Sequence, residues 1–108
     1  MGPPTEFVNV LQASVREGIS NTLGRVVADT LLTLLKQPFQ LYADRPSEFH
    51  RDLDRVFGSA SMTLEKMIGK ELFHKLNLRY PIGSAFDFET HVNLARQHLT
   101  NPRGYLKS

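Results

Sequence analysis

Histidine and glutamate side chains at helical spacings are the first candidates for chemistry in this sequence. His91 and His98 lie seven residues apart, which would place both on one face of a helix. Glu71 and His74 have the Glu-x-x-His spacing of di-iron helical bundles, but those sites need a second copy of the motif and two further glutamates. The chain has no second copy and no cysteine. The sequence therefore predicts no metal site and favours solvated histidines.

A pair of acids, Asp87 and Glu89, is the second candidate. General acid–base catalysis uses carboxylates whose environments push their pKa values apart within one cleft. Both acids stand at the start of an expected helix, where the helix dipole already favours negative charge, so we interpret them as capping residues. The chain also lacks a Gly-x-Ser-x-Gly elbow, a phosphate-binding glycine loop and a cysteine nucleophile. We therefore predict that the protein is not an enzyme and needs no cofactor.

Basic residues are concentrated late in the chain, where residues 66–108 carry a net charge of +4 and the remainder carries −2. A helix-turn-helix-like pair over residues 46–76, with Gly58 in its turn, would place a polar and basic face near DNA. That face would consist of Thr63, Lys66, Lys70 and His74. Against this interpretation, Asp52 and Asp54 in the preceding helix would repel the phosphates of DNA. Nucleic-acid binding is therefore the alternative function, and a solvated basic surface is preferred.

Five segments have apolar residues at helical spacing, and none alternates as a strand would. Thr5 is expected to cap the first helix. We expect a break or kink near residues 18–21, followed by a second helix that ends near Lys36. One long helix through Lys36 is the alternative. Pro46 is expected to open the third helix and Gly58 to end it.

The apolar stripes of these five helices predict the core. They are Val8, Leu11, Val15 and Ile19; Val27, Leu31, Leu34 and Leu35; Phe49, Leu53, Val56 and Phe57; Leu64, Met67, Ile68, Leu72 and Leu76; and Phe88, Val92, Ala95 and Leu99. Residues 39–45 are expected to form a connector, and Ser84 with Asp87 resembles a capping box before the last helix. Every apparent linker is short. The sequence thus predicts an all-α fold, a single compact bundle of about five helices, in one domain over residues 1–108.

Two neighbouring stretches share a pattern of glycine and apolar positions with a known group of domains. The stretches are NTLGRVVADTLLTLLK (residues 21–36) and SEFHRDLDRVFGSASMTLEKMIGKELFHKLNL (residues 47–78). They resemble the Nitrosopumilus output domain group, archaeal helical domains first catalogued as of unknown function. The matching positions are Leu23, Gly24, Phe49, Leu53, Phe57, Gly58, Leu64, Ile68, Leu72 and Leu76. The resemblance implies a role downstream of a signal-receiving module, and it supplies no catalytic residues.

Apolar residues beyond the main stripes predict how the domain acts. Phe7, Val10, Val26 and Leu32 lie partly off the stripes of the first two helices, and such a surplus marks either an interface or a wider core. We therefore predict a non-enzymatic regulatory or assembly domain that associates with itself, as a two-fold dimer, or with a protein partner. The longest apolar run, residues 26–35, is too short to cross a bilayer, and no signal peptide is visible. A cytoplasmic location without membrane association is expected.

Overall fold

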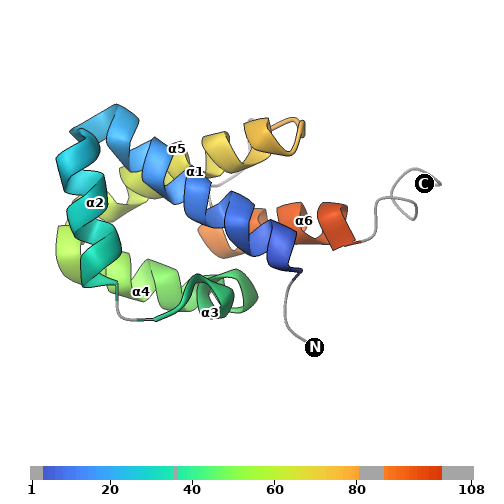
Figure 1. Cartoon of the computed structure of the whole chain (residues 1–108), viewed down its shortest axis with the longest axis horizontal. Helices are drawn as coiled ribbons and strands as arrows, with labels where there is room; N and C mark the ends of the chain where they lie inside the picture. Colours follow the sequence, from blue (N-terminus) through green and yellow to red (C-terminus); the bar gives the residue numbers. More distant parts are fainter. Residues whose placement is uncertain (1–3, 36, 81–86, 101–108) are drawn as a thin grey trace.

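Helices account for the regular secondary structure of the part of the chain that the structure describes (Figure 1). The computed structural model describes residues 4–35, 37–80 and 87–100, and no strand occurs among them. The elements are α1 (Thr5–Leu23), α2 (Arg25–Leu34), α3 (Phe39–Asp44), α4 (Pro46–Phe57), the 3₁₀ helix η1 (Gly58–Ala60), α5 (Ser61–Lys75) and α6 (Phe88–Thr100). The predicted all-α bundle is confirmed. None of the described helices is both long enough and apolar enough to span a membrane.

The longest helix, α1, packs against α2, α3 and α5, whereas α6 packs against α4 and α5 (Figure 1). An inward stripe on α1 is at most 2% exposed and consists of Phe7, Leu11, Val15 and Ile19. The other large helices complete the same core with Leu64, Ile68 and Leu72 from α5, Phe49 and Leu53 from α4, and Phe88, Val92 and Ala95 from α6. These contacts confirm most of the predicted stripes of the first, fourth and fifth helices.

The first helix does not break where the sequence suggested. α1 continues through residues 18–21 and ends at Leu23, so the break between the first two helices comes later than expected, at Gly24, and the single long helix is wrong. Gly18 is buried against the backbone of Ile68 in α5, and this tertiary contact holds the helix together at a residue of low helix propensity. The chain turns instead at Gly24, whose φ of +96° is a conformation that glycine adopts readily.

The observed helix ends agree in part with those predicted from the sequence. Gly58 ends α4 with a φ of +59°, as predicted, and Asn77 has a φ of +58° just beyond α5. Thr5 is not a cap, because it is the first helical residue and follows Pro4, with no side-chain hydrogen bond to the helix end. The capping box predicted at Ser84 lies outside the described residues.

Two predicted stripes are right only in part, although Leu31 on α2 and Phe49 and Leu53 on α4 are buried as predicted. On α2, Val27 and Leu34 are 37% and 54% exposed, and Ala28, which was not predicted, is buried. On α4, Val56 is 45% exposed and Phe57 is only half-buried, although it packs against the core. Both helices have apolar residues on more than one side, so the spacing alone does not select the face that their neighbours cover.

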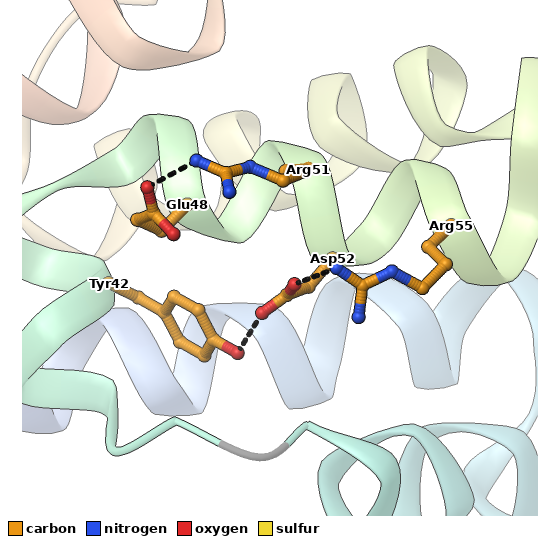
Figure 2. Close-up of polar contacts among 5 residues, drawn as sticks. All are labelled: Tyr42, Glu48, Arg51, Asp52 and Arg55. Atoms are coloured by element: carbon orange, nitrogen blue, oxygen red, sulfur yellow. Dashed lines mark hydrogen bonds and ion pairs between the residues drawn. The ribbon is translucent and has the colours of Figure 1, made fainter.

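The predicted connector over residues 39–45 is largely the short helix α3. It brings Tyr42 into the core, where the ring meets Phe39 and Phe49 at centroid distances of 5.5 and 5.3 Å. The Tyr42 hydroxyl donates a 2.6 Å hydrogen bond to Asp52 of α4, and Asp52 also pairs with Arg55 at 3.3 Å (Figure 2). Burial, reinforced by Asp52, raises the pKa of the Tyr42 hydroxyl. Tertiary packing therefore makes a helix of a segment too short to be stable alone.

Candidate functional site

The four residues predicted for self-association are not all on the surface. Phe7 is fully buried and belongs to the core, so its assignment to an interface is wrong. Val10 and Leu32 are half-buried and pack against the core. Val26 is 79% exposed, the largest exposure among the exposed large hydrophobic residues of the described chain. Of the four predicted residues, Val26 is therefore the one whose side chain is open to a partner.

An outer face of α2 surrounds Val26. At 3.6 residues per turn, the side chains of this face fall within a sector of about 120°. They are Val26, Val27, Thr30, Thr33 and Leu34, all of them exposed. The opposite side of the helix carries Ala28 and Leu31, which pack inward. α2 is consequently apolar on two faces, and its neighbours in this chain cover only one of them.

The two threonines of this face do not make it polar. Thr30 donates its hydroxyl hydrogen bond to the Val26 carbonyl at 2.8 Å, and Thr33 donates to the Asp29 carbonyl at 3.0 Å. Both hydroxyls are thus satisfied within the helix, which is a common arrangement for threonine in helices. Asp29 is held at the edge of the face by Arg16 of α1 at 3.2 Å. The outer face itself contains no charged side chain.

Further exposed apolar side chains belong to helix segments at the same end of the molecule as α2. The described chain has seven exposed large hydrophobic side chains, and six belong to elements at the end drawn on the left in Figure 1. That end comprises the last turn of α1, all of α2, the end of α4 and the start of α5 (Figure 1). We call these six residues the apolar end: Leu23, Val26, Val27, Leu34, Val56 and Met62. The seventh, Leu94, lies on α6.

A buried acid is the feature that the sequence analysis missed. Glu65 of α5 is 2% exposed, and its Oε2 lies 2.6 Å from Nδ1 of His50 on α4. Burial raises the pKa of the Glu65 carboxyl, and the contact with His50 offsets part of that rise. The burial of Glu65 could have been predicted from its position in the sequence. Glu65 lies three residues before Ile68 and seven before Leu72, on the apolar stripe of its helix.

A pocket of about 170 Å³ opens beside Glu65. Its lining consists of Ser47, His50, Met62, Glu65, Asp87, Phe88 and Glu89. Asp87 also accepts a hydrogen bond from the Thr90 hydroxyl at the start of α6. The pocket is smaller than the roughly 300–1,000 Å³ of typical small-molecule sites. Within the described chain, no three or more His, Cys, Asp or Glu side chains are arranged to hold a metal ion.

The prediction that the histidines are exposed to solvent is partly wrong. His91 is 5% exposed on the inner side of α6, with its ring 5.9 Å from that of Phe73 and 5.3 Å from that of Tyr80. Burial lowers the pKa of His91. His98 is half-buried, whereas His74 is exposed on α5. His91 therefore belongs to an aromatic cluster rather than to the surface.

The face proposed for nucleic acid is exposed. Its members Thr63, Lys66, Lys70 and His74 follow one another at three- and four-residue intervals along α5, so they share a side of that helix. Beside this side, Lys75 pairs with Glu17 of α1 at 2.6 Å. The acids that argued against DNA binding are engaged in the protein, since Asp52 binds Tyr42 and Asp54 accepts from the Ser61 hydroxyl. Nucleic-acid binding by this face stays a prediction.

Comparison with known proteins supplies no relative. No protein-family model, no curated protein and no solved structure matches this chain. The resemblance to the Nitrosopumilus output domain group accordingly stays a prediction that rests on the residues quoted above.

Proposed function

We propose that this protein is a non-enzymatic assembly or regulatory domain that associates with itself through the apolar end. The observation that carries the proposal is the exposed apolar outer face of α2, together with the location of six of the seven exposed large hydrophobic residues in helix segments at the same end of the molecule (Figure 1). Isolated exposed apolar residues are ordinary on protein surfaces, but a grouping of them is typical of an interaction site.

The physical driving force is the removal of this apolar surface from water. Each square ångström of apolar surface that is buried contributes roughly 25 cal/mol to the free energy of association. Burial of side chains as exposed as Val26 and Leu34 would therefore favour association. The hydroxyl hydrogen bonds of Thr30 and Thr33 remain inside the helix, so burying these residues would not leave their hydroxyls without a partner. A polar surface of equal area would gain far less.

The pocket beside Glu65 gives weaker support to an enzymatic role. Its volume of about 170 Å³ is small for a substrate, and its buried carboxylate is already engaged by His50. A protein-interaction role therefore accounts for the exposed features better than catalysis does.

Light scattering coupled to size-exclusion chromatography tests the proposal. The unaltered protein is expected to show a mass above that of the 12.3 kDa chain as its concentration rises. Val26→Glu should shift the protein toward the monomer, because it would place a charge in the buried interface. The control is Leu94→Glu on α6, where an exposed apolar side chain, 45% exposed against 79% for Val26, lies away from the apolar end, and the mass should stay unchanged. Leu32 is unsuitable, since it packs against the core.

Two outcomes would contradict self-association through the apolar end. A monomeric mass at the highest soluble concentration would exclude self-association, and equal effects of Val26→Glu and Leu94→Glu would exclude a specific role for the apolar end. Helical circular dichroism of both variants should match that of the unaltered protein, which separates dissociation from unfolding.

A further inference from the structure

The outer face of α2 carries an apolar side chain at each end and a threonine at its centre. Thr30 stands at its centre, Val27 and Thr33 lie three residues to either side, and Val26 and Leu34 lie four residues to either side. The larger apolar side chains thus occupy both ends of the face, and the smaller threonines include its midpoint. A two-fold interface requires such self-complementarity, because each residue must meet its counterpart from the same surface.

The midpoint also suits a close approach of two helices. Thr30 is short, and its hydroxyl is turned back onto the Val26 carbonyl, so it demands no polar partner from a second helix. Helices that pack in this way lie about 8–10 Å apart between their axes. With Thr30 at the crossing point of an antiparallel pair, Val26 of each copy would face Leu34 of the other.

We propose that two copies of the chain pair their α2 helices antiparallel about a two-fold axis through Thr30. This inference rests on the proposed function and adds the arrangement of the partner. No charged side chain lies on the outer face to oppose the approach of a second copy. The single face of a ten-residue helix is smaller than the roughly 800 Å² per partner of a standard interface. The rest of the apolar end is expected to enlarge the contact.

Cysteine cross-linking tests this arrangement, because the natural chain contains no cysteine. With helix axes about 8–10 Å apart and α-carbons about 2.3 Å from each helix axis, the α-carbons of the two copies of residue 30 would lie about 3.4–5.4 Å apart. A disulfide needs about 4.4–6.8 Å, which overlaps this range. Thr30→Cys should therefore convert most chains to a covalent dimer under mild oxidation, judged by non-reducing gel electrophoresis.

Positions away from the axis provide the discriminating measurement. Val26 and Leu34 are eight residues apart, so residue 26 of one copy would lie about 12 Å along the helix from residue 26 of the other. Val26→Cys alone and Leu34→Cys alone should each stay largely uncross-linked, whereas a mixture of the two variants should form the mixed dimer. Leu94→Cys on α6 is the matched control and should not cross-link.

The outcomes separate this inference from the proposed function. Efficient cross-linking of Val26→Cys and Leu34→Cys on their own would indicate parallel helices and overturn the antiparallel arrangement. A dimeric mass by light scattering with no cross-link at any α2 position would also overturn it, and self-association would stand. A monomeric mass in every condition would overturn both.

Discussion

Gly18 of α1 lies directly against the backbone of Ile68 in α5. A β-carbon placed on Gly18 would stand 3.1 Å from both the Cα and the backbone nitrogen of Ile68, closer than such atoms normally approach. Because Ile68 is fully buried at the centre of α5, its backbone has little room to move. The missing side chain of Gly18 thus sets how closely the two longest helices of the bundle pack.

Substitution of Gly18 should therefore destabilise the fold. Gly18→Val would force branched atoms into the Ile68 backbone, and overpacking of this kind costs about 1–3 kcal/mol or more in the free energy of unfolding. The gain in helix propensity, at most about 1 kcal/mol, would not compensate. Urea denaturation provides the measurement. Asn9→Val on the exposed side of α1 is the control and should change the free energy by less than about 0.5 kcal/mol.

The two phenylalanines of α4 should differ in their contribution to stability. Phe49 is 2% exposed and meets the rings of Tyr42 and Phe88, so Phe49→Ala should cost about 3–5 kcal/mol. Phe57 is only half-buried near the helix end, and Phe57→Ala should cost clearly less. Chemical denaturation of both variants decides this. Equal losses would mean that Phe57 is as deeply packed as the sequence pattern alone suggested.

Removing His50 should expose the cost of burying Glu65. His50→Ala leaves a carboxylate that is 2% exposed without its hydrogen-bond partner, which costs about 1–3 kcal/mol near neutral pH. The pKa of Glu65 is raised in the folded protein, so its carboxyl is neutral in both states at low pH. The loss should consequently be smallest below pH 4.5 and grow as the pH rises through the raised pKa of Glu65.

The matched variant for this experiment is Glu65→Gln, which keeps the shape of the side chain and removes its charge. In that background, His50→Ala should cost less, and the pH dependence should flatten. Urea midpoints measured across the pH range for the four proteins form a double-mutant cycle. A cycle with no coupling between the two positions would show that the 2.6 Å contact contributes nothing to stability.

His91 should make the fold sensitive to mild acid. Burial lowers the pKa of His91 below its ordinary 6.5, so between these two pKa values the unfolded chain binds a proton that the folded chain does not. Burial of neutral His91 therefore does not reduce the free energy of unfolding above pH 6.5. The free energy of unfolding falls as the pH drops from 6.5 toward the lowered pKa of His91. His91→Phe, which suits the neighbouring rings of Phe73 and Tyr80, should remove this part of the pH dependence.

Thermal unfolding midpoints between pH 5 and pH 8 provide the measurement for His91. The control is His74→Gln, which alters an exposed histidine on α5 and should leave the pH profile as it is in the unaltered protein. If His91→Phe retains the full loss of stability in acid, the sensitivity arises at another residue.

The sequence by itself determined the class of fold and most of its core. Stripes such as Leu64, Ile68 and Leu72 repeat at helical spacing, and their burial follows directly because one face of each helix must leave water. Gly58 likewise marked a helix end by its tolerance of positive φ. These properties depend on residues near one another in the chain, and a sequence pattern can report them.

Tertiary structure alone decided which apolar face is exposed and which polar residues are buried. α2 carries apolar residues on two sides, and packing against α1 covers Ala28 and Leu31 while Val26 remains in solvent. Glu65 and His50 are fifteen residues apart on different helices, so no local sequence pattern predicts their contact. The same reason explains Phe7, whose burial depends on neighbours supplied by distant segments. Exposure is a property of the assembled bundle, because whether a side chain meets solvent or another helix depends on residues far away in the sequence.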